Sequence, residues 1–268
     1  MTDLETQSSK ILMVFAHADD ETLLAGALIA KLVSDGHAVT VLCLAPGDDD
    51  RTKRLHKACE VLGVGTVETL RYSEGVMWRD ELDEASSESE DLNLTPVLSV
   101  VPVGDLASRV GGRVSEINPD IVITHSVHGD YGHPDHAAVY EATLRAVERS
   151  ASDTLRLYAL SWPRWMVKFN IRLMKLGGRE VRKMGPRGRF NLSAAVYRSQ
   201  KSTTSIKVGN KLGVRREASR WYSVEIARGP LPMRVLERVP LWIQSRFLGK
   251  ARLTLVNKPK DVPGNHIL

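Results

Sequence analysis

The stretch that decides the fold runs from Ile11 to Leu24 and reads ILMVFAHADDETLL. Its first six residues form an apolar run without alternation, which is typical of a strand buried on both faces. One imidazole and three carboxylates, His17, Asp19, Asp20 and Glu21, follow at once, and a helical pattern begins at Thr22. A strand that ends in polar residues and leads into a helix places those residues at the carboxyl end of a sheet strand, where open α/β sheets bind their ligands.

Strands and helices alternate along most of the remaining chain. Further buried strands are expected at 39–45, 66–70, 120–125 and 154–161, and helices at 22–35, 51–62, 102–117 and 135–149. This alternation predicts an α/β protein with a Rossmann-like, mostly parallel sheet and helices on both faces. Further short helices are expected at 193–202 and 216–227.

Three segments differ from this pattern. Residues 1–10 are polar and are expected to be a disordered lead-in, so that a single domain would span 11–268. Residues 79–95 are acidic and rich in serine, which predicts a solvated loop. Residues 162–189 combine Trp, Met, Phe and Leu at helical spacing with many lysines and arginines, and they begin a basic C-terminal elaboration.

The composition limits the class of protein. The chain has 268 residues, a formal net charge of +5 and a pI of about 9.2, and much of the positive excess lies in 162–189. The pI alone leaves a nucleic-acid-binding module open, but we expect no nucleic-acid partner. Cys43 and Cys59 lie in apolar segments without CxxC spacing, which indicates buried thiols. Because no run of 18 apolar residues and no signal-peptide pattern occurs, we expect a cytoplasmic protein.

A second polar cluster, His128-Gly-Asp-Tyr131-Gly-His133-Pro-Asp135-His136, follows the strand expected at 120–125. We expect the two clusters to meet in space, because both follow strands of one parallel sheet. His17, Asp20 and His136 would supply three ligands to a zinc ion and leave its fourth position open for water. The same cysteine-free set also suits Mn²⁺ or Fe²⁺.

The other residues of the two clusters have expected roles in hydrolysis. A metal ion lowers the pKa of bound water from ~15.7 to about 7, and Asp19 is placed to take the proton as general base. His133 would act as an imidazolium that stabilises the oxyanion and protonates the leaving amine. Asp135 would orient a neighbouring ring. His125 and His128 are expected to be structural residues of the loop.

Ala16-His17-Ala18-Asp19-Asp20-Glu21 and His133-Pro134-Asp135-His136 resemble the motifs AHPDDE and HPDH of the PIG-L / LmbE-like family of zinc-dependent N-acetylglucosaminyl deacetylases. PDIVITH before the second motif and Ala195-Val-Tyr197-Arg-Ser199-Gln200 extend the resemblance. It implies a PIG-L/LmbE-like fold, His17, Asp20 and His136 as zinc ligands, Asp19 as base and His133 as the electrophilic histidine. Tyr131 matches a tyrosine that also polarises the carbonyl in some members.

The sequence departs from the family pattern at three places. Ala18 replaces the usual proline, which predicts a looser turn with intact chemistry. Arg51-Thr-Lys-Arg54 stands where the family usually has R-x-x-E, and Glu74 stands where an aspartate is common after the third strand. These departures bear on the substrate rather than on the reaction.

The resemblance implies a hydrolase that removes the acetyl group from an N-acetylated amino sugar, such as a GlcNAc conjugate, and releases acetate and a free amine. An amidase acting on a larger sugar or thiol conjugate stays open, as does a non-catalytic sugar-binding relative, although such a relative would normally have lost the base that Asp19 supplies. The chain has no GxGxxG, GxxxxGK[ST] or GxSxG motif, which excludes nicotinamide oxidoreductases, P-loop NTPases and serine hydrolases with that motif.

The aromatic residues of 162–176 have two interpretations. An ordinary amphipathic helix would pack them against the sheet or the mouth of the active site. Alternatively, this segment makes peripheral contact with an anionic membrane and admits a lipid-linked or large substrate, because basic residues surround the aromatic ones.

Overall fold

A computed structural model describes residues 8–78, 95–198, 201–228 and 231–257. Residues 1–7 of the expected lead-in and all of the acidic segment except Thr95 lie outside the described residues. The expected boundary of the lead-in at residue 10 is too late, because Lys10 already belongs to the first strand and the Ser9 amide donates to His37 Nδ1.

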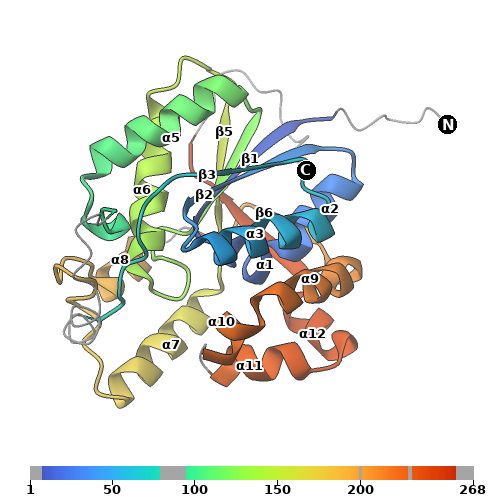
Figure 1. Ribbon diagram of the computed structural model, residues 1–268. Coiled ribbons are helices and arrows are strands. Elements are labelled where there is room, and N and C mark those ends of the chain that lie inside the picture. The colour runs from blue at the N-terminus through green and yellow to red at the C-terminus, as the bar shows by residue number, and fades with distance from the viewer. Residues whose placement is uncertain (1–7, 79–94, 199–200, 229–230, 258–268) are drawn as a thin grey trace.

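A seven-stranded sheet in the order β3-β2-β1-β4-β5-β7-β6 forms the centre of the protein (Figure 1). Five strands are parallel, as the sequence predicts: β1 (Lys10–His17), β2 (Ala38–Ala45), β3 (Thr66–Thr69), β4 (Ile121–Thr124) and β5 (Arg156–Leu160). Two strands that the sequence pattern did not predict complete the sheet. β7 (Lys250–Leu255) runs antiparallel to both β5 and β6 (Thr204–Lys207), so the C-terminal segment shares the sheet with the rest of the chain.

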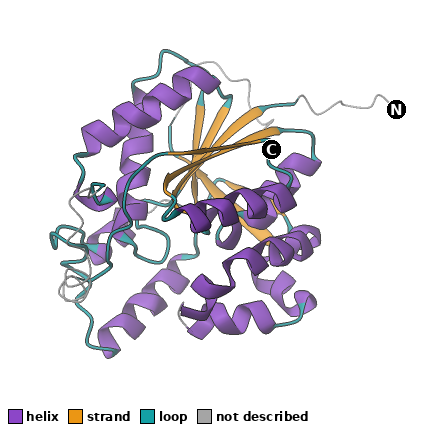
Figure 2. Ribbon diagram, in the orientation of Figure 1, coloured by secondary structure: helices purple, strands orange, loops and turns teal. Residues whose placement is uncertain are grey.

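Helices cover both faces of the sheet (Figure 2). α2 (Gly26–Ser34), α3 (Asp49–Leu62) and α9 (Leu212–Ser219) share one core with Ile11, Met13 and Phe15. α5 (Val103–Ile117) and α6 (Pro134–Glu148) share the other with Leu12, Val14 and Ala16. Alternate side chains of a strand point to opposite faces. Because both faces of β1 are covered, every position of its apolar run is buried.

The helix expected at 22–35 is interrupted. α1 (Asp20–Leu23) is a single turn, and α2 starts at Gly26 after Ala25 leaves the helical conformation with φ −124°. The short α1 places Asp20 directly after β1. Because β1 and β4 are neighbours in the sheet, while β2 and β5 lie on their outer sides, the topological switch point falls between the carboxyl ends of β1 and β4.

The C-terminal elaboration contains α7 (Arg164–Leu176), α8 (Leu192–Arg198), α10 (Ser223–Arg228), α11 (Leu231–Arg238) and α12 (Leu241–Leu248). A small separate core, made by Val167, Val181, Met184, Leu192 and Val196, holds α7 and α8 together. α7, α10, α11 and α12 lie toward one end of the molecule, at the bottom of Figure 1. Within the described residues, every helix is too short or too polar to cross a membrane.

Candidate active site

The first motif forms a tight, buried turn at the end of β1. The His17 amide donates to Asp20 Oδ2 over 2.9 Å, and Asp19 has a positive φ of 120°. This strained backbone is held by Glu21, whose carboxylate accepts the Asp19 N–H over 3.0 Å. Arg51 Nε also donates to the Ala18 carbonyl oxygen over 3.1 Å, so two side chains hold the turn in which Ala18 replaces the usual proline.

The second motif forms the loop between β4 and α6. Gly129, Asp130 and Gly132 have φ values of 68°, 59° and 111°, which fold the loop back on itself. Aspartate tolerates this left-handed conformation better than most residues. His133 is the N-cap of α6, and Pro134 follows in the first helical position, where proline is favoured.

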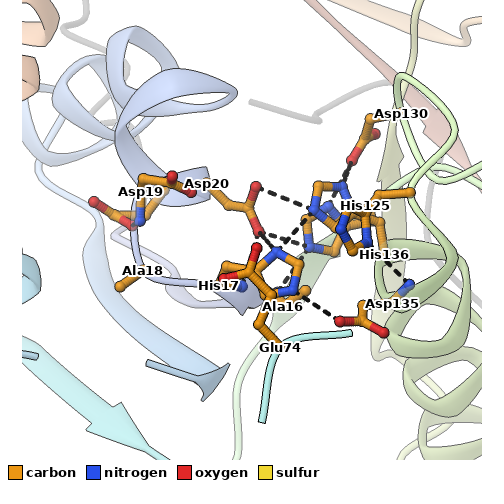
Figure 3. A network of polar contacts seen from close by, with 12 residues as sticks. Ala16, His17, Ala18, Asp19, Asp20, Glu74, His125, Asp130, Asp135 and His136 are labelled. Carbon is orange, nitrogen blue, oxygen red and sulfur yellow. Dashed lines mark hydrogen bonds and ion pairs between the residues drawn. The ribbon is translucent and has the colours of Figure 1, made fainter. Parts of the chain in front are cut away.

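The two motifs meet at the topological switch point, as expected (Figure 3). His17 Nδ1 lies 3.2 Å from His136 Nε2 and 3.6 Å from Asp20 Oδ2. His136 Nε2 lies 3.3 Å from Asp20 Oδ1. All three side chains are buried, so these donor atoms face one another away from bulk water.

A second carboxylate anchors the far nitrogen of each ring. Asp135 Oδ2 lies 3.0 Å from His17 Nε2, and its carboxylate also accepts the Gly75 amide over 2.7 Å. Asp130 Oδ2 lies 3.0 Å from His136 Nδ1. These contacts place the ring proton on the far nitrogen and leave the lone pairs of His17 Nδ1 and His136 Nε2 directed into the site.

The donor set fits a metal ion. Four ligands at ~2.0–2.1 Å from a tetrahedral zinc ion are separated by about 3.4 Å, close to the 3.2 to 3.6 Å found here. His125 and His133 also lie within reach of this group. His125 is engaged at both nitrogens, because Nε2 accepts the Ala16 amide over 2.8 Å and Nδ1 contacts Asp130 over 2.6 Å. The structure thus contains a buried His/Asp metal-binding cluster.

The electrostatics of the cluster favour a positive charge. Burial by itself lowers the pKa of His17, but the carboxylates of Glu74, Asp135 and Asp20 overcome it and raise this pKa to about 9. Burial raises the pKa of Asp20 well above its ordinary value, against the opposing effect of His17. A buried group of carboxylates around an imidazole therefore attracts either a proton or a metal cation.

Asp19 diverges from Asp20 at the turn (Figure 3). Burial raises the pKa of Asp19 to about 7, although Arg51 and His17 lower it. Its carboxylate retains 18% exposure, and Arg51 Nη2 contacts it over 3.3 Å. Arg51 also binds Glu74 over 2.5 Å, so one guanidinium holds two carboxylates at the entrance of the site.

His133 differs from the expectation based on the sequence. Burial and the neighbouring His17 lower its pKa to about 4, so its ring is neutral at neutral pH rather than an imidazolium. The Asp135 amide donates to its Nδ1 over 3.2 Å, as an N-cap contact. The ring proton must then be on Nε2, which leaves one N–H donor.

Tyr131 stands at the boundary between the site and solvent. Its side chain is 42% exposed, and its ring lies edge-on to His136 with 5.2 Å between the ring centroids. His128 is buried and contacts Ser126 Oγ over 3.1 Å, away from the cluster. Tyr197 of the expected Y-x-SQ segment is 82% exposed, and Ser199 and Gln200 lie outside the described residues.

Sequence reasoning missed Asp130. Its carboxylate contacts His125 and His136, and these histidines hold its pKa well below its usual range despite burial. It also accepts Trp162 Nε1–H over 3.2 Å. The available signal was an aspartate directly after Gly129, between His128 and His133 of the second motif.

Comparison with known proteins adds three findings. A profile of the PIG-L family, described as GlcNAc-PI de-N-acetylase, matches residues 12–147. The 1D-myo-inositol 2-acetamido-2-deoxy-alpha-D-glucopyranoside deacetylase of Kineococcus radiotolerans is 31% identical over 172 residues, which are 56% of this chain and 48% of that protein. The chain spans about half to two thirds of the length of the curated relatives it matches.

Solved structures share the fold at low sequence identity. The N,N'-diacetylchitobiose deacetylase of Pyrococcus horikoshii has a TM-score of 0.57 and 14% identity, covering 93% of this chain and 84% of that one. GalB of Pseudomonas putida, a 4-carboxy-2-hydroxymuconate hydratase, has a TM-score of 0.56 and 16% identity over 97% and 100% of the two chains. One fold therefore carries different reactions, and the reaction must be argued from the site.

Proposed function

Because the chain belongs to the PIG-L family, we propose that it is a metal-dependent hydrolase that removes the acetyl group from an N-acetylated amino sugar. One observation carries the proposal. His17 Nδ1, His136 Nε2 and the Asp20 carboxylate converge, buried and within 3.2 to 3.6 Å of one another, each with its remaining polar atoms anchored. The relative from Kineococcus radiotolerans is named as a deacetylase of an N-acetylated sugar, which supports this choice of substrate.

The proposed ligands are His17, Asp20 and His136. Two imidazoles and one carboxylate suit zinc best, and Mn²⁺ or Fe²⁺ also accept them. When bound, the ion supplies Lewis acidity that polarises a carbonyl and makes water nucleophilic at neutral pH. Asp135 and Asp130 position the two imidazole ligands, because each holds the far nitrogen of one ring.

Asp19 is the proposed general base. A carboxylate with a pKa of about 7 accepts a proton effectively near neutral pH. In the reaction, the water oxygen bonds to the acetyl carbon and Asp19 takes the water proton. The carbon–nitrogen bond then breaks, and the proton passes to the departing amine. Because burial and His17 lower the pKa of His133, we assign this proton to Asp19 rather than to His133.

His133 is the proposed donor to the substrate carbonyl. Its Nε2–H can hydrogen-bond to the oxygen on which negative charge develops, which stabilises the transition state. Tyr131 would act as a second polarising group, since its ring stands beside His136 at the solvent boundary.

We also propose that the protein is cytoplasmic and forms a single domain. Cys43 and Cys59 are both buried and free, as expected for a reducing compartment. The antiparallel strands β6 and β7 extend the same sheet that the N-terminal part builds, which supports the single domain.

The test is release of primary amine from a panel of N-acetylglucosaminides by metal-stripped protein, with and without added Zn²⁺. Zinc-dependent release from any member supports the proposal. Asp19→Ala should retain zinc and lose about 10²- to 10⁴-fold in turnover, whereas Asp20→Ala should weaken zinc binding itself. Asp50→Ala, at an exposed carboxylate of α3, is the matched control.

Two outcomes would count against the proposal. If zinc-loaded protein released no amine from any member of the panel, a larger conjugate as substrate or a non-catalytic role would be favoured. Unchanged turnover in Asp19→Ala would refute the assignment of the base.

A further inference from the structure

The outward side of α7 is apolar and uncovered. Trp165, Phe169 and Leu176 have exposed fractions of 68%, 55% and 85%, and those of Met166 and Leu173 are 38% and 45%. With 3.6 residues per turn, these five positions occupy one continuous arc of about 100° on the helix surface. Of the two interpretations of 162–176, packing against the protein holds for Trp162, which contacts Asp130 at the site, but it does not hold for these five residues.

Different residues attach α7 to the protein. Val167 is buried, and Ile171 and Met174 pack beside it in the small core that also contains Leu192. These three residues lie on the opposite side of the helix from the exposed arc. The helix is thus docked by one apolar side and presents a second apolar side to the surroundings.

The arc between these two sides is basic. Lys168, Arg172 and Lys175 are exposed, and α7 contains no acidic residue. No ion pair joins these three side chains to any part of the chain that the structure describes. Positive charge that no described carboxylate pairs, beside an exposed apolar arc, is typical of helices that lie in the headgroup region of anionic membranes.

We propose that α7 docks the protein on an anionic lipid bilayer. A bilayer offers negative charge for the lysines and arginine and hydrocarbon for the aromatic side chains over one flat surface. α12 adds Trp242 and Phe247, each 70% exposed, together with Arg246. α12 and α7 both lie toward the lower end of the molecule in Figure 1.

The docking helix is attached directly to the candidate active site. Asn170 Nδ2 on α7 donates to the Tyr131 carbonyl oxygen over 2.8 Å. Trp162, just before α7, donates from Nε1 to Asp130, the residue that anchors His136. A bilayer against α7 therefore lies next to the loop that holds the second motif. A docked α7 would give a lipid-linked amino sugar direct access to this loop, and this part of the inference rests on the proposed function.

The experiment is flotation of the zinc-loaded protein with large vesicles. Wild-type protein should float with vesicles containing phosphatidylglycerol at low salt and should remain behind with pure phosphatidylcholine. K168Q/R172Q/K175Q should weaken binding by about a hundredfold, at about fivefold for each charge. W165S/F169S should weaken it by about tenfold or more.

K53Q/K57Q is the matched control, because it removes two exposed lysines from α3 and should float like wild type. No flotation of wild-type protein at low salt overturns the inference, as does equal binding by K168Q/R172Q/K175Q. Capture by polyglutamate without capture by vesicles would instead indicate an acidic protein partner and also overturns it.

Turnover of a water-soluble N-acetylglucosaminide separates this inference from the proposed function. Turnover of the water-soluble substrate by a protein that does not float refutes only the proposal that α7 docks on a bilayer. Flotation without turnover of either soluble or lipid-linked substrate leaves the membrane surface standing and refutes the deacetylase.

Discussion

Replacing Tyr222 with Phe removes one hydroxyl from a buried cluster behind the first motif. The Tyr222 hydroxyl donates to Glu21 Oε1 over 2.8 Å, and both side chains are fully buried. Glu21 also accepts Thr22 Oγ1–H over 2.6 Å and the Asp19 amide over 3.0 Å. The tyrosine thus connects the C-terminal elaboration to the turn that carries the proposed base.

The size of the effect follows from these contacts. Leaving a buried acceptor short of one donor costs about 1–3 kcal/mol. Since Glu21 Oε1 keeps its bond from Thr22, we expect a loss near the middle of this range, about 2 kcal/mol. In a chain of this size, 1 kcal/mol shifts the melting temperature by roughly 2–4 °C, so Tyr222→Phe should melt about 4–8 °C lower.

Tyr158→Phe is the matched control. Tyr158 is also fully buried, but its hydroxyl has no hydrogen-bond partner among the described residues, so its removal breaks no hydrogen bond there and should not lower stability. Urea denaturation and thermal melts of the three proteins, at equal zinc loading, give the comparison. Equal stability of the two variants would refute the reasoning that Tyr222 stabilises the Glu21 carboxylate.

Three further substitutions test the supports of the site. Asp135→Asn removes the carboxylate behind one proposed imidazole ligand and should weaken zinc affinity about 10- to 100-fold in a chelator competition; unchanged affinity would contradict that role. Gly129→Ala places a Cβ 2.3 Å from the His133 carbonyl oxygen at a positive φ and should prevent normal folding, as judged by the yield of cooperatively melting protein, whereas Gly112→Ala meets no atom within 4 Å and should be tolerated. Burial lowers the pKa of His128, so below about pH 6.5 the unfolded chain binds a proton that the folded chain does not, and stability falls as the pH falls. His128→Gln should therefore lose less stability than wild type between pH 6.5 and 5 in thermal melts, and parallel curves would contradict this.

The parallel part of the sheet could be predicted because its central strands are buried on both faces. Apolar runs such as 11–16 and 39–45 are easy to recognise when helical patterns separate them. β6 and β7 could not be found this way. They lie toward one edge of the sheet. β6 ends at Lys207, β7 begins at Lys250, and neither strand contains an apolar run. β7 joins the sheet by pairing with β5, and β6 joins it by pairing with β7, so their place depends on these contacts rather than on their own pattern.

The convergence of His17, Asp20 and His136 was predictable for a similar reason. Their motifs directly follow β1 and β4, and neighbouring parallel strands end at the same edge. The anchoring of these side chains was not predictable, because it depends on backbone conformation. Asp130 reaches His136 only with a left-handed φ of 59°, and Tyr222 reaches Glu21 across 201 positions of the chain.

The departure at Arg54 shows how the C-terminal elaboration completes the site region. The family usually has a glutamate three residues after the arginine, and this chain has a second arginine there. Arg54 Nη2 contacts Glu225 of α10 over 2.7 Å, and the same carboxylate lies 3.8 Å from Arg51 Nε. A carboxylate therefore still stands beside Arg51, but α10 supplies it instead of α3. Because Arg51 in turn holds Asp19 and Glu74, the charge balance around the proposed base depends on a helix that the matched family region, 12–147, does not contain.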